Sequence, residues 1–171
     1  MRRLSIFLIS LLFALTTFAE SNRGIGVSGK SNRIALVIGN SNYQSAPLRN
    51  PANDANDMAS VLKQKGFTVT LLKDATQRQM EKEIGRFGKS LRDGGVGLFF
   101  YAGHGMQVNG TNYLIPIGAN IEAEEDIKFE SVDANRILAK MEAAGNDLNM
   151  VFLDACRNIL FARSFRSSNK G

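Results

Sequence analysis

The stretch Val96-Gly-Leu-Phe-Phe-Tyr-Ala-Gly-His-Gly105 decides the fold, because an unbroken apolar run leads directly into the only histidine of the chain. Such a run, here 96–102, is typical of a strand that is buried on both faces. A second run, Met150-Val-Phe-Leu-Asp-Ala155, has the same character and is followed by the only cysteine, Cys156. The two runs predict two strands of one sheet, each with a chemically versatile residue after it.

Strand and helix patterns alternate around these two runs. Residues 34–38 and 67–72 predict two further strands, and Asn109-Gly110 predicts the turn of a short hairpin that returns through 113–115. Three helices are expected to begin at Asn50, Thr76 and Ser131 and to end at the glycines 66, 94 and 145. The residues of the third helix that are expected to face the core are Ala134, Ile137, Leu138 and Met141.

The alternation of strands and helices predicts right-handed crossovers and a mainly parallel sheet with helices on both faces, a three-layer α/β/α domain. In sheets of this kind the ligand crevice lies outside the carboxyl ends of the strands. His104 follows the third strand and Cys156 follows the fourth. We therefore expect both residues at the same edge of the sheet.

A histidine beside a cysteine suits nucleophilic chemistry. The imidazole can take the proton of the thiol, which is mostly protonated at neutral pH, and can later protonate a leaving amine. The backbone N–H groups of Gly105 and Cys156 are candidate donors to a developing oxyanion. Each residue alone also has an ordinary structural interpretation, as a small buried side chain for the cysteine and a turn residue for the histidine.

Composition narrows the alternatives. The chain has 171 residues, of which 44% are hydrophobic and 22% charged, which indicates one globular domain. One cysteine and one histidine exclude an internal disulfide and metal sites built on several such residues. A net charge of +5 is too mild to indicate a nucleic-acid partner. The acidic segment 122–126 is interpreted as a solvated loop, so no metal and no cofactor are assigned.

The two ends of the chain are expected to lie outside the domain. Residues 1–19 have the basic start, apolar centre and small-residue end of a secretory signal peptide, with an uncleaved anchor as the alternative. Residues 20–32 are interpreted as a flexible linker. The match of Gly24-x-Gly26-x-x-Gly29 to a dinucleotide fingerprint is accidental, because no strand precedes it. The domain is expected over 33–160, with a basic tail at 161–171, and the protein is expected in the periplasm or outside the cell.

Two motifs, Tyr101-Ala-Gly-His-Gly105 and Asp154-Ala-Cys-Arg-Asn158, resemble those of the caspase-like cysteine peptidases, nearest to the bacterial metacaspase and orthocaspase branch. The segments 33–43 and 53–57 also resemble the first strand and first helix of that family, so that the likeness extends over about residues 33–165. It implies a caspase–hemoglobinase fold and a Cys–His dyad without a required third member, with His104 as the base and Cys156 as the nucleophile.

The resemblance also implies a substrate preference. Metacaspase-like enzymes cleave after Arg or Lys, and Asp154 should share a face of its strand with Cys156. A carboxylate there would bind a cationic side chain. Asp54 resembles the second acidic pocket residue of the family, although a first-turn acid is also favoured by the helix dipole alone. Partners are therefore peptide or protein substrates with Arg or Lys before the scissile bond, and neither nucleic acid nor a membrane span after signal cleavage is expected.

Two departures from the family pattern leave alternatives open. In the family, two more strands follow the cysteine strand and complete the pocket, so this chain is interpreted as the large-subunit portion, truncated after the fourth strand. The alternative functions are a non-catalytic interaction module on the same fold and, more remotely, a phosphate-binding doubly wound domain. The basic tail is interpreted either as a solvated segment or as a self-processing linker.

Overall fold

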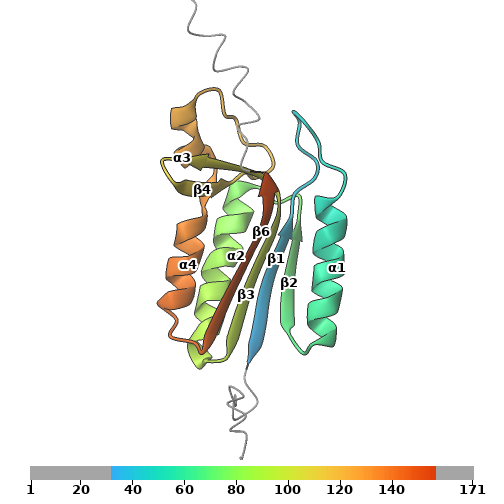
Figure 1. Ribbon diagram of the computed structural model, residues 1–171, viewed down its shortest axis with the longest axis vertical. Helices are drawn as coiled ribbons and strands as arrows, with labels where there is room; N and C mark the ends of the chain where they lie inside the picture. Colours follow the sequence, from blue (N-terminus) through green and yellow to red (C-terminus); the bar gives the residue numbers. More distant parts are fainter. Residues whose placement is uncertain (1–31, 157–171) are drawn as a thin grey trace, which may run out of the picture.

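The structure is a computed structural model that describes residues 32–156, with Cys156 described by its main chain. A six-stranded sheet forms its centre, in the order β2-β1-β3-β4-β5, and β6 pairs with β3 (Figure 1). The parallel strands are β1 (Arg33–Gly39), β2 (Thr68–Lys73), β3 (Val96–Val108) and β6 (Leu148–Cys156). The antiparallel strands are β4 (Thr111–Leu114) and β5 (Val132–Asp133).

Helices cover both faces of the sheet, which confirms the expected three-layer α/β/α architecture. Figure 1 shows α1 (Pro51–Gln64) on one side of the sheet and α2 (Gln77–Ser90) with α4 (Ala134–Glu142) on the other. The shorter helices are η1 (Leu91–Asp93), η2 (Glu124–Asp126) and α3 (Ile127–Glu130). The predicted signal peptide 1–19, nearly all of the predicted linker 20–32 and the predicted tail 161–171 lie outside the described residues.

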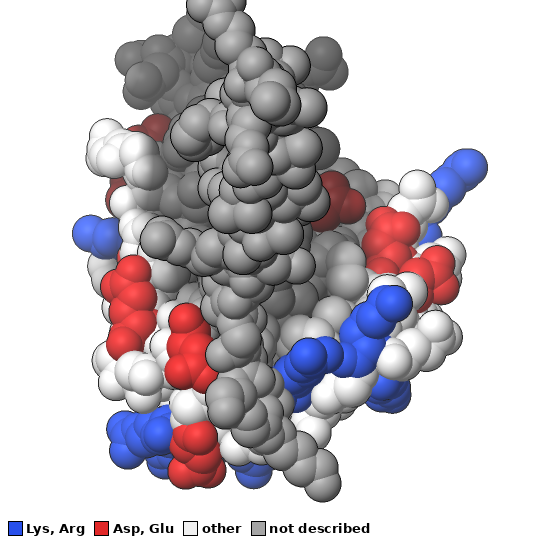
Figure 2. Space-filling model, turned by 60° about the horizontal axis from the view of Figure 1, so that its bottom comes forward, with Lys and Arg blue, Asp and Glu red and all other residues white. Residues whose placement is uncertain are grey.

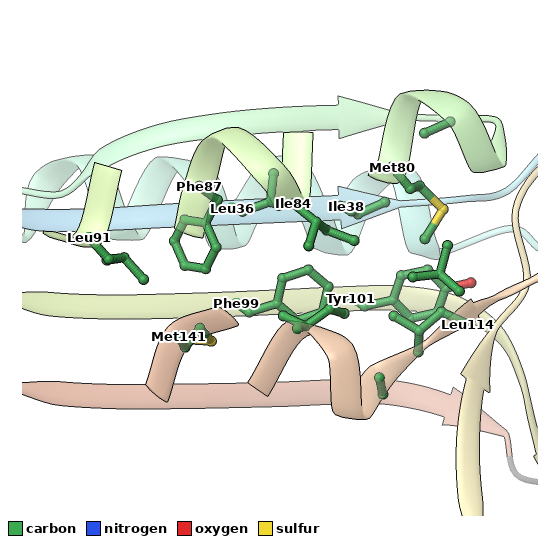
Figure 3. Close-up of a cluster of buried hydrophobic side chains, with 14 residues drawn as sticks. Leu36, Ile38, Met80, Ile84, Phe87, Leu91, Phe99, Tyr101, Leu114 and Met141 are labelled. Atoms are coloured by element: carbon green, nitrogen blue, oxygen red, sulfur yellow. The ribbon is translucent and has the colours of Figure 1, made fainter. Parts of the chain in front are cut away.

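The two layers of core meet at β3, whose side chains alternate between them. Phe99 and Tyr101 lie in the cluster between the sheet and α2 and α4, which Figure 3 shows with its Tyr101 ring beside Leu114. Phe100 and Ala102 lie in the cluster under α1. Because both faces of β3 are covered, an unbroken apolar sequence is stable there, and burial of each large side chain contributes ~1.5–3 kcal/mol.

The start of α1 was predicted correctly in position but not in its capping group. Asn50 stands at the N-cap position, and Pro51 is the first helical residue. However, Asn50 has helical backbone angles and its side chain makes no capping hydrogen bond. The Oγ of Ser41, on the loop after β1, accepts from the Ala52 N–H at 2.9 Å instead. This bond ties the helix start to the carboxyl end of β1.

The predicted start of the third helix, at Ser131, is wrong. Ser131 does not begin a helix, because its hydroxyl donates back to the Ile127 carbonyl at the end of α3 and the chain then forms the short strand β5. The N-cap is Asp133, whose carboxylate accepts from the Asn135 N–H at 2.8 Å. Ala134, Ile137 and Met141 are buried as expected, but Leu138 is 40% exposed rather than in the core.

The third strand is longer than predicted, and this difference matters for the site. The sequence placed His104 just after a strand over 96–102, but β3 continues through His104 to Val108. The turn at Asn109 and Gly110, which both have positive φ, follows and leads into β4, as expected. The extension is stable because Met106 is buried and β4 provides hydrogen-bonding partners. The histidine is therefore held in a strand rather than on a loop.

The surface of the described residues carries charges of both signs. Figure 2 shows basic and acidic side chains together on the face of the molecule that is visible there. Within residues 32–156, no helix combines the length and the apolar character that crossing a bilayer requires.

Candidate active site

The register between β3 and β6 brings the two predicted site positions together. His104 is the register partner of Cys156, and Ala102 is the partner of Asp154, on neighbouring parallel strands. Hydrogen-bonded strands lie about 4.8 Å apart, so the two backbones approach as closely as a sheet allows. The end of β6 thus places the only cysteine beside the only histidine of the chain.

The His104 side chain is buried, with 5% of its surface exposed, and its ring is oriented by a backbone carbonyl. Its Nε2 lies 2.7 Å from the carbonyl oxygen of Ala46, on the loop between β1 and α1. A carbonyl oxygen can only accept, so Nε2 carries the proton of this hydrogen bond. In the neutral imidazole, Nδ1 is then the unprotonated nitrogen that can accept a proton from a thiol.

Ala46 was not predicted as part of the site. A backbone carbonyl leaves no signature in the sequence, since any residue type carries one. Ala46 has a φ of 62°, which is uncommon for a residue other than glycine, and this conformation belongs to the loop that presents its carbonyl to His104. Such strained residues cluster at functional sites, but they become visible only in a structure.

Two tyrosine hydroxyl groups form hydrogen bonds with the main chain of His104. Tyr43, on the loop after β1, accepts from the His104 N–H at 2.9 Å and donates to the Ile115 carbonyl at 3.0 Å. Tyr101 donates to the His104 carbonyl at 2.7 Å. The two hydroxyl oxygens lie 3.2 Å apart, and the Tyr43 and His104 ring centroids lie 4.3 Å apart. Both the N–H and the C=O of His104 therefore contact a phenol.

The hydroxyl groups of Tyr43 and Tyr101 leave no room for a side chain at position 103, which is a glycine. A Cβ atom at this position would lie 2.6 Å from the hydroxyl oxygens of both Tyr43 and Tyr101, closer than side-chain atoms approach one another. The glycine before the histidine therefore makes room for the phenol pair beneath the strand.

Both phenols resist ionisation in the folded protein. Burial raises the pKa of Tyr43 above its usual value of 10.0, and burial together with the neighbouring Tyr43 raises the pKa of Tyr101 well above it. A phenol whose pKa is raised on folding keeps its proton where the unfolded chain loses it. Its contribution to stability is therefore complete below pH 10 and is lost as pH rises above 10.

We accordingly expect the free energy of unfolding to fall steeply above pH 10. Urea unfolding at a series of pH values between 8 and 11 measures this slope. Tyr43→Phe or Tyr101→Phe should flatten the slope, because either substitution removes one of the two titrating groups. Tyr113→Phe, which changes the third tyrosine, is the matched control. A slope that all three variants share with the unchanged chain would contradict the expectation.

The orientation of the Gly105 N–H follows from the hydrogen bonds of its neighbours. Ala102 accepts from Asn40 on the β1 side, and His104 faces Tyr43 and Ile115 on that same side. Successive N–H groups of a strand point to opposite sides. The Gly105 N–H is therefore directed toward the β6 side, where Cys156 lies in register with His104.

The two acidic residues predicted to bind substrate lie on the same side of the sheet. Asp54 is half-buried in the first turn of α1. Asp154 is exposed near the end of β6 and, by alternation, shares the α1 side with Met150, which packs against the core under α1. Among the described residues the ion pairs are Arg86–Glu83 and Arg136–Glu81, so neither acid is paired there.

The acidic segment 122–126 has a local structural role. The Asp126 carboxylate accepts from the N–H groups of Glu122 and Ala123, at 3.0 and 2.8 Å, and so closes the turn that begins η2. Within residues 32–156, no group of three or more His, Cys, Asp or Glu side chains is arranged to hold a metal ion.

The fold and the register define an α/β/α domain whose single histidine and cysteine meet at one sheet edge. Residues 32–170 match the caspase domain family. The human mucosa-associated lymphoid tissue lymphoma translocation protein 1 is 33% identical over 128 residues, and the mouse homolog is 32% identical. The alignment covers 74% of this chain but 15% of each of those longer proteins.

A solved structure is similar as well, and it bears on the fold alone. A crystal structure of a protein from Geobacter sulfurreducens superposes with a TM-score of 0.55 at 23% identity, over 73% of this chain and 50% of that one. The chain belongs to the caspase domain family of cysteine peptidases. The family expected from the sequence motifs is confirmed, and the metacaspase and orthocaspase branch stays a prediction.

Proposed function

We propose that this protein is a cysteine endopeptidase that cleaves after Arg or Lys with Cys156 as nucleophile and His104 as general base. The observation that supports this proposal best is the β3–β6 register, which pairs His104 with Cys156 at the carboxyl edge of the sheet. The hydrogen bond from His104 Nε2 to the Ala46 carbonyl adds to it, because that bond leaves Nδ1 as the proton acceptor. Membership of a peptidase family implies protein or peptide substrates.

In this proposal, His104 Nδ1 takes the proton of the Cys156 thiol as the sulfur attacks the scissile carbonyl carbon. The carbonyl oxygen becomes an oxyanion, and the N–H groups of Gly105 and Cys156 donate to it. As the C–N bond breaks, His104 returns the proton to the leaving amine and a thioester remains. His104 then deprotonates a water that attacks the thioester, and the released thiolate takes the proton back.

A cavity beside His104 gives the leaving group a place in this proposal. Its volume is about 130 Å³, and its lining includes His104, residues of the loop after β1 and Pro116. In the sheet, β1 and β6 lie on opposite sides of β3, so the loop after β1 lies across β3 from Cys156. The part of the substrate that follows the scissile bond would leave on this side, next to the group that protonates its amine.

Selectivity for basic residues is proposed to come from Asp154, with Asp54 as a second wall of the pocket. Both lie on the α1 side of the sheet, and neither is neutralised by an ion pair within the described residues. A guanidinium forms charge-assisted hydrogen bonds to a carboxylate, whereas an acidic substrate residue meets like charge. A bound substrate would cover the exposed Asp154 and bury this pair. Loss of one partner of a buried pair costs ~2–5 kcal/mol, which corresponds to a discrimination of at least several tens-fold.

This specificity is tested with matched peptides that differ only in the residue before the scissile bond, which is Arg, Lys, Asp or Leu. We expect Arg and Lys to be cleaved, Asp to be rejected, and the preference for Arg to collapse in Asp154→Asn. Asp93→Asn, which changes an exposed acid in η1, is the matched control and should keep the ranking. Equal turnover of the Asp and Arg peptides, or an unchanged ranking in Asp154→Asn, would refute the acidic pocket.

We further propose that β6 pairs with a strand from a C-terminal small-subunit portion. Within the described residues β6 pairs only with β3, and its nine residues form an unpaired edge. Four of its large apolar side chains are 37–50% exposed, namely Leu148, Val151, Phe152 and Leu153. Long apolar edges of this kind favour addition of a further strand. Protection of the β6 amides from hydrogen exchange, when a longer chain is compared with this one, would test the pairing.

The alternative function, a non-catalytic interaction module, would use the same exposed edge. An Arg-terminated peptide with an irreversible thiol-reactive group distinguishes the two. A peptidase is labelled at Cys156, and the labelling requires His104 and the Arg side chain. In an interaction module, labelling of Cys156 would depend neither on His104 nor on the Arg side chain of the peptide.

We also propose that the protein is exported, to the periplasm or the cell exterior, on the basis of the signal-peptide pattern in residues 1–19. Mass analysis should then find a mature chain that begins near Glu20. Intact Met1 on protein from the cytoplasm would overturn this proposal.

A further inference from the structure

We propose that Tyr43 and Tyr101 are positioning residues, whose hydroxyl groups set the place and the tautomer of His104. This inference rests on the proposed function only in the role it assigns to His104. The two hydroxyl groups are not members of the dyad; they contact the main chain of the histidine.

The β3–β4 ladder shows what the Tyr43 hydroxyl does. His104 and Ile115 are opposite one another at the start of the ladder, since Gly105 is the register partner of Leu114. The Ile115 N–H donates to the His104 carbonyl at 3.0 Å, which is one half of an antiparallel pair. The other half would run from the His104 N–H to the Ile115 carbonyl. The Tyr43 hydroxyl lies between these two groups instead, at 2.9 and 3.0 Å.

A hydroxyl inserted in this way opens the ladder on one side. Two hydrogen bonds in series keep the His104 nitrogen farther from the Ile115 oxygen than a single direct hydrogen bond would. Tyr101 donates to the His104 carbonyl at 2.7 Å and fixes the C=O group of the same residue. Without the Tyr43 hydroxyl, the ladder can close directly, and the His104 main chain then moves toward Ile115 and away from its present place beside β6.

The ring of His104 depends on the same arrangement. Its Nε2 contacts the Ala46 carbonyl at 2.7 Å, and Tyr43 and Ala46 belong to the same loop after β1. A shift of the His104 main chain alters this contact while the loop stays in place. The proton on Nε2 then loses its acceptor, and the preference for an unprotonated Nδ1 is lost with it. The two hydroxyls therefore control the tautomer through the backbone.

The experiment uses the fact that the chain has one histidine and one cysteine. Nitrogen NMR of the imidazole reports the His104 tautomer, and the pH profile of Cys156 alkylation by iodoacetamide reports the help that His104 gives the thiol. Neither readout requires proteolysis. Tyr43→Phe and Tyr101→Phe remove one hydroxyl each and keep the ring, and Tyr113→Phe on β4 is the matched control.

We expect the unchanged chain and Tyr113→Phe to show one tautomer, with the proton on Nε2. Tyr43→Phe should show mixed tautomers and alkylation about tenfold slower at pH 7, a part of the ~10²–10⁴ that a positioned base contributes. Tyr101→Phe should act in the same direction. A structural role alone would lower the unfolding temperature and leave the tautomer and the pH profile unchanged, and that result would overturn the proposal.

A measurement on the unchanged chain decides the case even where a variant fails to fold. The buried Tyr43 hydroxyl proton should show a nuclear Overhauser contact to the His104 amide proton, and absence of that contact would overturn the inserted hydroxyl. The outcome is also separable from the proposed function. An altered tautomer in Tyr43→Phe of a protein that cleaves no peptide would refute the peptidase and keep the positioning role.

Discussion

Cys156→Ala and His104→Ala should each reduce cleavage of an Arg-terminated peptide to the background rate. Loss of a nucleophile or of its base costs about 10⁴–10⁶ in kcat, because the remaining groups no longer form a reactive pair. For the same reason we expect the double variant to be no slower than either single variant. Steady-state cleavage measures this, with the rates normalised to the concentration of folded protein.

The stability of these variants separates chemistry from folding. Removing the imidazole leaves the Ala46 carbonyl without its donor, so His104→Ala should also lose ~1–3 kcal/mol of unfolding free energy. Gln107→Ala, an exposed position on the same strand, is the control and should keep both activity and stability. Near-normal cleavage by Cys156→Ala would show that another group is the nucleophile.

The layout of the sheet could be predicted because its strands are covered on both faces. Residues 96–102 had to be an apolar run, since one side of β3 packs under α1 and the other against α2 and α4. The meeting of His104 and Cys156 was predictable for a related reason. Parallel strands end at a common edge, so residues that follow two neighbouring strands come together whatever their separation in the chain.

The groups that support the histidine could not be predicted in the same way. The Tyr43 hydroxyl lies 61 residues from the backbone it contacts, and the Ala46 carbonyl 58 residues from the ring it orients. Contacts of this kind follow no periodicity. Local start signals also failed where a competing partner existed. Ser131 has the side chain of an N-cap, but its hydroxyl bonds the carbonyl of Ile127, and Asp133 begins the helix instead.

Gly103→Ala should cause a large loss of stability, although it adds a single methyl group. The new Cβ would lie 2.6 Å from both phenol oxygens and 2.9 Å from the Tyr101 Cζ, and the backbone φ of +156° is one that side-chain-bearing residues rarely adopt. Neither phenol can move away freely, because both are buried and hydrogen-bonded. Overpacking and backbone strain each cost about 1–3 kcal/mol, so we expect a loss of about 3 kcal/mol or more.

Gly85→Ala is the matched control, since the same methyl group in the middle of α2 meets nothing within 4 Å. Alanine has the better helix propensity, so this variant should gain up to about 1 kcal/mol. The cause of the Gly103 effect is tested by a double-mutant cycle with Tyr43→Phe, which removes one of the two oxygens that the new Cβ would strike. The cost of Gly103→Ala should be smaller in that background, because the two changes are in contact. Strictly additive losses would show that the phenol oxygen is not what requires a glycine, and that the backbone angle alone sets the requirement.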